Sequence, residues 1–283
     1  MRVGSQRYGA DLAVQRNLLG AYAQLRLAST RLSTMSRINR GSDDPAGLIA
    51  VEQLRSELTA IKAASDNAAR AAGAIHVADS AMAEVGDLLN SIRGNVVAAS
   101  GGGLSDAEID AKQIEVDAAL DAIDRIGSYT SFNGRQLLAG GSMTLNVSPD
   151  VDDLTTLELP AVSTASLGSG TARLADLASG GTASLASGNA AEAIDALDAA
   201  QSQVLRARSR LGAFEKHTID STQRVLGAME ENVRAAKSRI GDTDLAAEMS
   251  RLIRAEIMVQ AATSTMALAG ERHRLIGGLF DAY

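Results

Sequence analysis

Apolar residues recur at steps of three or four over most of this sequence. In residues 18–38 they fall at Leu18, Tyr22, Leu25, Leu32 and Ile38. That spacing places them on one side of an α-helix, so the region is predicted to be an amphipathic helix with a narrow apolar stripe. The last helix is predicted near the C-terminus, with apolar positions at Leu245, Met249, Leu252, Ile253, Ile257 and Leu268.

Two longer helical segments lie between these ends, and both carry the heptad spacing of a coiled-coil or bundle seam. The first predicted seam is Val51, Leu54, Leu58, Ile61, Ser65, Ala68, Ala72, Ile75, Asp79 and Met82, continuing after a one-step shift as Val85, Leu88, Ile92 and Val96. The last long helix is predicted to begin near Ala190. Its seam is predicted at Leu197, Ala200, Val204, Ala207, Leu211, Phe214, Thr218, Ser221, Val225, Ala228, Asn232 and Ala235.

A short segment, RINRGSDDPAGLIAVEQLRSEL at residues 37–58, interrupts the helical pattern. Gly41 is suited to end the first helix, because glycine is favoured just past a helix C-terminus. Asp44 can cap the next helix and Pro45 can occupy its first position, while Asp43 also favours the positive end of the helix dipole. The segment is therefore predicted to be a joint between two rods.

A second joint is predicted at residues 239–249, RIGDTDLAAEM. There Gly241 would end one helix and Asp242 or Thr243 would cap the next. The layout is close to mirror-symmetric, with a terminal helix and a joint at each end of the chain. The two terminal helices are therefore predicted to pair with each other.

Residues 142–160 alternate in polarity and predict a β-hairpin. The following stretch, 163–189, is rich in Gly, Ser, Ala and Thr, and is predicted to be a loose surface loop. A second, shorter helix before the hairpin carries Ile109, Gln113, Val116, Leu120 and Ile123 on one face. The predicted fold class is mainly α: a long antiparallel helical rod over 43–242 with a small β-hairpin, and a separate coiled coil formed by 1–42 and 243–283.

The composition supports thin helical seams instead of a deep core. Apolar residues make up 46% of the 283 residues, but aromatic residues only 2%, and Trp and Cys are absent. The net charge is −7, although residues 1–42 contain seven arginines and one aspartate. These arginines alternate with apolar positions and include no lysine cluster, so nucleic-acid binding is not expected. No run approaches the roughly 20 apolar residues of a membrane span, and the N-terminus lacks the apolar core of a secretory signal.

Residues able to carry chemistry are scattered. His76, His217 and His273 lie on different predicted helices, and none has a neighbour at metal-ligand spacing. Asp43 and Asp44 are adjacent at a helix start and point in different directions, whereas an acid–base pair needs opposed groups. We therefore expect no catalytic, cofactor or metal site and no enzyme activity.

The terminal stripes are too thin to form a stable core by themselves. Many copies packed side by side could bury the faces between them, and open-ended contacts of that kind build filaments. A filament subunit is the function that this pattern favours. The alternative of another class is a coiled-coil adaptor or signalling rod.

Several blocks of the sequence resemble bacterial flagellins. RLSTMSRINRGSDDPAGLIAVEQLRSEL and the following AASDNAARAAGAIHVADSAMAEVGDLL are similar to the N-terminal region of that family, and LDAIDRIGSYTSFNGRQLLAG to the block after it. VLRARSRLGAFEKHTIDSTQRVLGAMEENVRAAKSRIGDTDLAAEMSRLIRAEIMVQAATSTMALA is similar to its C-terminal region. The blocks recur in the family's order and cover roughly 230 residues at the two ends of the chain, while large variable middle domains are absent.

The resemblance implies a filament subunit with residues 1–42 and 243–283 in an inner coiled-coil tube and residues 43–242 in an outer rod. It implies an extracellular location, export through the flagellar type III gate without a cleaved signal, and an export chaperone on the C-terminal helix. Cap and hook-associated proteins would be further partners. Arg93 and Glu115 fall where some flagellins contact Toll-like receptor five, although Gly94 and Asn95 replace the usual Glu-Leu.

A related alternative is the hook–filament junction protein, which shares the terminal helices and has an SDDP joint of its own. The AGLI continuation after the joint and the FNGRQLL block favour flagellin. The end of the chain, RLIGGLFDAY, departs from the usual flagellin ending.

Overall fold

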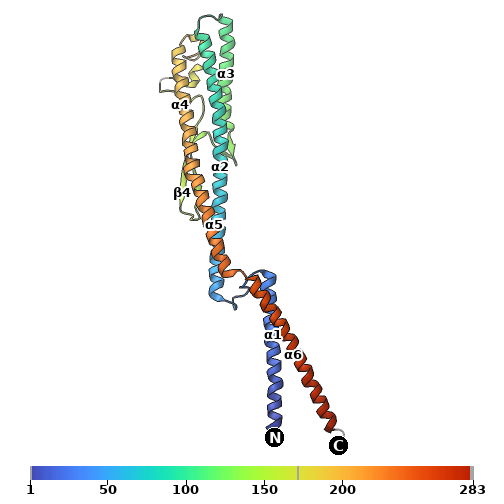
Figure 1. Cartoon of the computed structure of the whole chain (residues 1–283). Helices are drawn as coiled ribbons and strands as arrows, with labels where there is room; N and C mark the ends of the chain where they lie inside the picture. The colour runs from blue at the N-terminus through green and yellow to red at the C-terminus, as the bar shows by residue number, and fades with distance from the viewer. Residues whose placement is uncertain (1, 171, 281–283) are drawn as a thin grey trace. The chain divides into compact units, whose positions relative to one another are not determined.

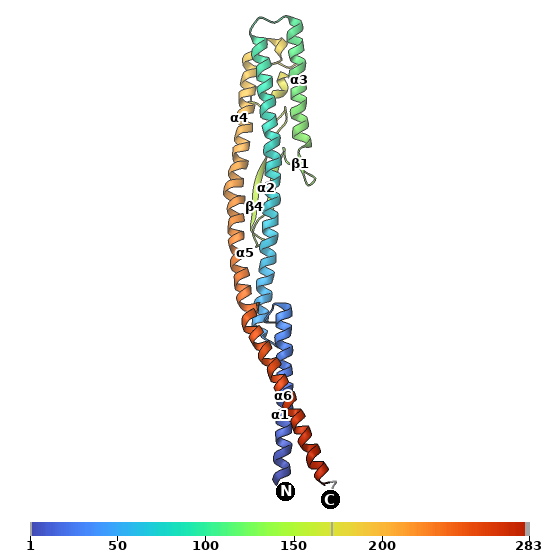
Figure 2. The ribbon, with the colours of Figure 1, turned by 45° about the vertical axis from the view of Figure 1, so that its right-hand side comes forward.

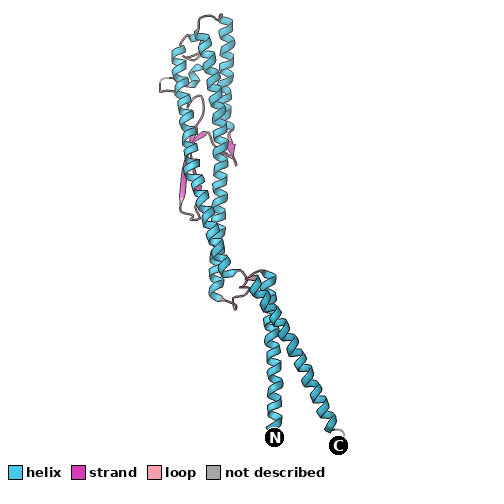
Figure 3. Ribbon diagram, viewed as in Figure 1, coloured by secondary structure: helices cyan, strands magenta, loops and turns pink. Residues whose placement is uncertain are grey.

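The computed structural model describes residues 2–170 and 172–280, except for the side chains of 2–11 and 272–280. Its long helices are α1 (Arg2–Thr34), α2 (Pro45–Ser100), α3 (Asp106–Tyr129), α4 (Ala190–Phe214), α5 (Asp220–Gly241) and α6 (Leu245–Phe280) (Figures 1 and 3). The short helices are η1 (Leu174–Leu177) and η2 (Leu185–Ser187), and the π-helical turn η3 (Glu215–Ile219) joins α4 to α5. The predicted mainly-α fold class is confirmed.

The chain forms two compact units. One comprises residues 59–230, and the other comprises 1–58 together with 231–283. The first unit contains α3, α4, both hairpins and most of α2, and the second contains α1, α6 and both joints. These units divide the chain inside α2 and α5, at other points than the predicted domains.

Most buried positions of α2 form one unbroken heptad series, and Ala74 and Asn95 are buried beside it. The series is Ile61, Ala64, Ala68, Ala71, Ile75, Ala78, Met82, Val85, Leu89, Ile92 and Val96. From Ile61 onward, four of the residues predicted in this seam are only half-buried, although two of them, Ala72 and Leu88, still pack against the core; the other two are Ser65 and Asp79. The predicted one-step shift before Val85 is absent, because the series is unbroken there. The buried alanines Ala64, Ala71 and Ala78 directly precede Ser65, Ala72 and Asp79. Because alanine is small and only weakly hydrophobic, the sequence offers little reason to prefer it over the residue that follows. The N-terminal half of the seam is lined mainly by alanines, with Ile61, Ile75 and Met82 between them.

The seam of α4 begins as predicted and then changes register. Leu211 is buried, but the next buried positions are Ile219 and Leu226 instead of the predicted Thr218 and Val225. The reason is η3, because a π-helical turn inserts one extra residue into an α-helix. Val225 is consequently 54% exposed, whereas Leu226 is 2% exposed.

Two antiparallel hairpins lie in the unit formed by residues 59–230. β1 (Ser131–Phe132) pairs with β2 (Arg135–Gln136), and β3 (Ala139–Asn146) pairs with β4 (Leu154–Ala161), with Met143 opposite Leu157. Asn133 and Gly134, which the sequence marks as a turn, both have positive φ, as the two-residue hairpin turn requires. Figure 2 shows β4 along α2 and α5, and the inward side chains of the larger hairpin join the helical core.

The segment 163–189 is not the loose surface loop that its composition predicted. Leu167, Leu174 and Leu177 are buried in the core shared with the helices. Polar side chains of α3 bind its backbone: Gln113 accepts the Leu185 N–H at 2.8 Å, and Asp117 accepts the Ser179 N–H at 2.9 Å. Small residues suit this arrangement, because they let the irregular backbone approach the helices closely enough to satisfy its polar groups.

Candidate assembly surface and joint

The seam between α1 and α6 closes on small side chains. Among the side chains that the structure describes, its buried apolar residues are Ala21 and Ala28 of α1 and Ala255 of α6. The half-buried seam positions on α1 include Leu18, Leu25 and Leu32, and those on α6 are Leu252, Val259, Ala262, Met266 and Ala269. Both sets keep three- and four-residue steps, which is the spacing of a coiled-coil seam. α1 and α6 therefore pair through a narrow seam of alternating alanines and larger, half-buried apolar residues.

Large apolar side chains point away from this seam. Of the residues proposed for polymerisation, Tyr22, Leu245, Met249, Ile253, Ile257 and Leu268 are exposed, while Leu18, Leu25, Leu32 and Leu252 are half-buried. Leu245, Met249, Ile253 and Ile257 follow one another at steps of four and form a ridge of the kind that packs into the groove of another helix. The four side chains of this ridge are 48–62% exposed, so the described part of the chain leaves them largely uncovered. Figures 1 and 2 show that α1 and α6 separate beyond the ridge, toward the chain ends.

Sequence reasoning missed the exposed apolar residues Leu12, Leu19 and Leu27 of α1. Leu19 is 69% exposed and Leu12 is 55% exposed, and with Tyr22 they continue an outward stripe at steps of seven and three. Leu19 directly follows Leu18, and the heptad pattern assigned the stripe to Leu18 alone. A second apolar stripe beside the first was the available signal for this surface.

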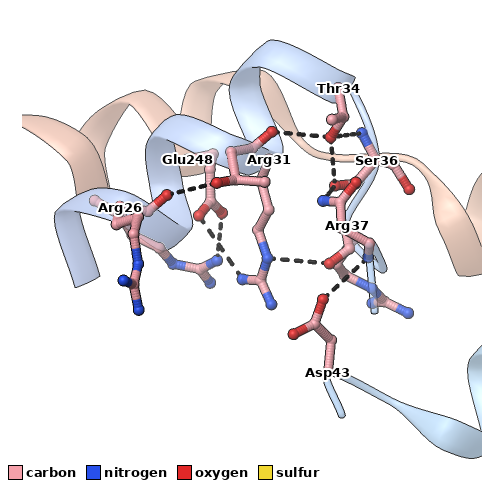
Figure 4. A network of polar contacts seen from close by, with 10 residues as sticks. Arg26, Arg31, Thr34, Ser36, Arg37, Asp43 and Glu248 are labelled. Atoms are coloured by element: carbon pink, nitrogen blue, oxygen red, sulfur yellow. Dashed lines mark hydrogen bonds and ion pairs between the residues drawn. The ribbon is translucent and has the colours of Figure 1, made fainter. Parts of the chain in front are cut away.

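A buried carboxylate ties α6 to the end of α1. Glu248 is 3% exposed, and its Oε2 accepts a hydrogen bond from Arg251 Nη1 at 2.7 Å. Its Oε1 lies 3.7 Å from Arg31 Nη1 of α1. Arg31 Nε in turn donates to the carbonyl oxygen of Arg37 at 3.0 Å, as Figure 4 shows. One guanidinium therefore links α1, α6 and the first joint.

The two joints contact each other through their backbones. The Arg37 N–H donates to the Gly241 carbonyl at 2.7 Å, and the Thr243 N–H donates to the Met35 carbonyl at 3.2 Å. These bonds form a one-residue antiparallel bridge between Ser36 and Asp242. The breaks before α2 and after α5 are therefore parts of one structure.

Gly41 does not end the first helix, contrary to the prediction. α1 ends at Thr34, and Met35 adopts the left-handed conformation with φ 55°. Gly41 lies in a later turn and does not have positive φ, and a Cβ there would make an ordinary 3.7 Å contact with Leu48 Cδ2. The conformation of the joint therefore does not require glycine at position 41.

The two aspartates bind backbone N–H groups. Asp43 Oδ2 accepts from Asn39 N and Arg40 N at 3.0 Å each, and these bonds hold the pKa of that carboxyl below its ordinary value. Asp44 Oδ1 accepts the Gly47 N–H at 2.9 Å and so caps α2, with Pro45 as the first helical residue. Both carboxylates therefore have architectural partners.

Gly47 is the residue of this motif with the least space. A Cβ at this position would lie 2.7 Å from Ile38 Cδ1 and in collision with the carboxylate of Asp44. Ile38 is itself buried. The capping carboxylate and Ile38 both rest against the face of Gly47 that carries no side chain.

α6 is capped by Asp244, and not by Asp242 or Thr243 as predicted. Asp244 Oδ1 accepts the Ala247 N–H at 3.1 Å. Asp242 still belongs to the last turn of the preceding helix, because its N–H donates to the Ser238 carbonyl at 2.9 Å. Gly241 is the last residue of α5, is buried, and would place a Cβ 3.2 Å from Val51 Cγ2. The two predicted caps take part in the β-bridge instead: Asp242 is paired with Ser36, and the Thr243 N–H donates to the Met35 carbonyl.

Arg93 and Glu115 already have partners within the chain. Arg93 on α2 contacts Asp198 of α4, and Glu115 on α3 accepts from Lys112 Nζ at 3.0 Å. The Lys112 ammonium lowers the pKa of the Glu115 carboxyl. Both residues lie in the unit formed by residues 59–230, outside the joints.

The histidines are not brought together. His76 Nε2 lies 3.1 Å from Glu215 Oε1, His217 is exposed in η3, and the side chain of His273 lies outside the described residues. Within the described part of the chain, no group of three His, Asp or Glu side chains is arranged to hold a metal ion.

The helical regions at both ends match known protein families. The N-terminal helical region of bacterial flagellin matches residues 6–143, and its C-terminal helical region matches residues 194–275. The chain belongs to the bacterial flagellin family. Flagellins are structural proteins, and this chain is a structural subunit of the flagellar filament.

Relatives match this flagellin over nearly its whole length. The flagellin of Bacillus subtilis is 32% identical over 274 residues, covering 86% of this chain and 88% of that protein. Flagellin FlaB2 of Treponema pallidum is 29% identical over 282 residues, covering 92% and 96%. These matches favour the filament subunit over the hook–filament junction protein and the adaptor rod.

A solved structure shares the fold. It is a protein of Vibrio parahaemolyticus assigned as a flagellar hook-associated protein, with a TM-score of 0.62 and 17% identity, covering 71% of this chain and all of that one. Among the described helices of this flagellin, none is both long and apolar enough to cross a lipid bilayer.

Proposed function

We propose that this flagellin polymerises through the outward faces of α1 and α6, which become buried between neighbouring copies. The observation that carries the proposal is a second set of large apolar side chains outside the seam of the pair. Among the described side chains, the seam buries alanines and half-buries Leu18, Leu25, Leu32 and Leu252. Leu19, Tyr22, Ile253 and Ile257 lie outside it and are 48–69% exposed. An ordinary two-helix pair buries its largest apolar residues, so a second contact is needed to cover them.

The size of the effect is sufficient for assembly. Fully burying a Leu, Ile or Met side chain contributes about 1.5–3 kcal/mol, and these side chains are already partly shielded, so about 1 kcal/mol each remains available. Several such residues on two helices supply the several kcal/mol that a protein contact requires. Because the two faces differ, the contact is heterologous, and a heterologous contact whose rotation does not close into a ring generates a helical polymer.

The domain division follows from this surface. Residues 1–42 and 243–283 would form the inner tube of the filament, and residues 43–242 the outer rod. The joint formed by Gly41, Asp43, Asp44, Pro45, Gly241 and Asp242 would fix the path of the chain between them. The backbone bonds between the two joints support this role.

Polymerisation of a substituted chain tests the proposal. Ile257→Ser and Met249→Ser remove apolar area from the ridge, and each should raise the critical concentration for seeded assembly roughly fivefold, the equivalent of about 1 kcal/mol. Leu205→Ser is the matched control, because Leu205 is also about half exposed but lies on α4. Circular dichroism should show unchanged helix content in all three variants.

Equal critical concentrations for the ridge variants and the native chain would contradict the proposal. A larger effect from Leu205→Ser than from either ridge variant would place the main contact on the unit formed by residues 59–230.

Further partners and the location of the filament belong to the same proposal. The exposed ridge of α6 is a suitable site for an export chaperone, which would cover it before the chain passes the type III export gate without a cleaved signal. Cap and hook-associated proteins would meet the same terminal faces at the ends of an extracellular filament. Contact with Toll-like receptor five through Arg93 and Glu115 would require a receptor that shares or displaces Asp198 and Lys112.

A further inference from the structure

Polar contacts between α2 and α4 fix the register of the two helices up to residue 215. Their partners on the α4 side repeat every seven residues at 201, 208 and 215, with one further contact at 198. The contacts are Arg93–Asp198, Asn90–Gln201 at 3.0 Å, Asp79–Arg208 at 2.8 Å and His76–Glu215 at 3.1 Å. The last of them falls on the first residue of η3.

The buried residues beyond this point follow a different register. In an unbroken heptad, Leu211 would be followed by Thr218 and Val225 in the seam, but the structure buries Ile219 and Leu226. The upstream contacts and the downstream core therefore disagree by one residue. The π-helical turn at Glu215–Ile219 takes up this extra residue.

The sequence can satisfy the seam in either register. Thr218 and Val225 are small and β-branched, and each directly precedes the larger residue that is buried, Ile219 or Leu226. Three residues before the turn stands Gly212, with no heavy atom within 4 Å of the position of a Cβ. Glycine lowers the cost of rearranging a helix, because it has no strong preference for the helical conformation.

We propose that residues 211–226 form a register switch. In the first state the π turn holds one extra residue, and Ile219 and Leu226 are buried in the seam. In the second state the turn becomes α-helical, and Thr218 and Val225 take their places. The helix beyond the turn then advances along its axis by one residue, about 1.5 Å, and rotates by about 100°.

The two states bury different side chains, so thiol accessibility distinguishes them. The native chain has no cysteine, and a single introduced thiol is therefore an unambiguous probe. Leu226→Cys reports the second state, in which residue 226 is exposed. Val204→Cys is the matched control, because Val204 is similarly buried in the seam of α4 before the turn. The measurement is the rate at which the full-length chain reacts with iodoacetamide.

A switching helix should label the thiol of Leu226→Cys at least roughly tenfold faster than that of Val204→Cys, because the second state exposes position 226 without global unfolding. Deleting the exposed Lys216 shortens the turn by one residue. Leu211 and the present Ile219 and Leu226 are then spaced by seven residues, so an uninterrupted α-helix can bury all three. In that deletion background, the two thiols should label equally slowly. Equal rates in the native-length chain would overturn the proposal, as would a fast rate at position 226 that the deletion leaves unchanged.

A second variant keeps the test decisive if the deletion variant does not fold. The substitutions Thr218→Ile, Ile219→Thr and Val225→Leu place the larger side chains at positions 218 and 225. These are the positions that follow Leu211 in a heptad without the extra residue. In this background the thiol of Leu226→Cys should label nearly as fast as the thiol of Val225→Cys does in the native sequence. Continued protection of the thiol at position 226 would show that the second register is not accessible.

Discussion

Gly47 at the start of α2 offers a test in which local propensity and packing predict opposite signs. On propensity alone, Gly47→Ala should stabilise the helix by about 0.5–1 kcal/mol. In the structure the new methyl group collides with the Asp44 carboxylate and meets Ile38. Displacing the cap costs about 1 kcal/mol and crowding the buried Ile38 about 1 kcal/mol more. The net expectation is a destabilisation of about 1 kcal/mol.

Amide hydrogen exchange in the first two turns of α2 measures this effect, because those amides report local opening of the helix start. A loss of about 1 kcal/mol corresponds to roughly fivefold faster exchange. Gly41→Ala is the control in the same joint, and it should change the exchange rates little, because its new methyl group has ordinary space.

A double-mutant cycle isolates the cause. Asp44→Ala alone should cost about 1 kcal/mol through loss of the cap. In that background Gly47→Ala meets only Ile38, so its cost should nearly vanish, and the two changes should couple by about 1 kcal/mol. Additive effects, or a stabilising Gly47→Ala in the native background, would refute the reasoning.

Three further expectations concern other parts of the fold. Glu248→Ala should destabilise the terminal helix pair by about 1–3 kcal/mol in urea unfolding, because it strands a half-buried arginine, whereas Arg251→Ala should cost under about 0.5 kcal/mol. Gly127→Ala should lower the stability by about 1–3 kcal/mol, because a Cβ there collides with a backbone carbonyl, and Gly86→Ala on an open helix face should instead raise it by about 0.5–1 kcal/mol. The pKa of Asp43 is lowered in the fold, so the ionised carboxylate should stabilise its turn fully above the ordinary aspartate pKa. That stabilisation should be lost as the pH falls through the lowered pKa. Amide exchange in the turn measures this pH dependence, and Asp43→Asn should abolish it.

The sequence predicted the elements better than their contacts. Heptad spacing and the Asn133–Gly134 turn located the helices and a hairpin, because both depend on local periodicity and backbone conformation. The seam of α2 was misassigned where Ala64 competes with Ser65, because both residues are small. The shift after Leu211 could not be foreseen, because heptad spacing gives no sign of the extra residue in the π-helical turn η3.

For the candidate assembly surface too, the helices were easier to predict than their contacts. The end of α1 was placed too late, because Met35 adopts positive φ without the glycine that usually signals it. Leu18, Leu25 and Leu32 of the predicted stripe do lie in the seam, but the second stripe of α1 that begins beside them at Leu19 was not recognised. Periodicity identifies an apolar stripe, but only packing decides which of two stripes is used within the chain and which is left for another molecule.

The tip of the larger hairpin, at residues 147–153, lies in a different compact unit from both chain termini. A peptide inserted between Asp150 and Val151 would extend an exposed turn and leave α1 and α6 unchanged. A fusion at either terminus would instead place foreign sequence beside the ridge of α6 or the stripe of α1. The hairpin tip is therefore the rational position for displaying an epitope or a label on this protein.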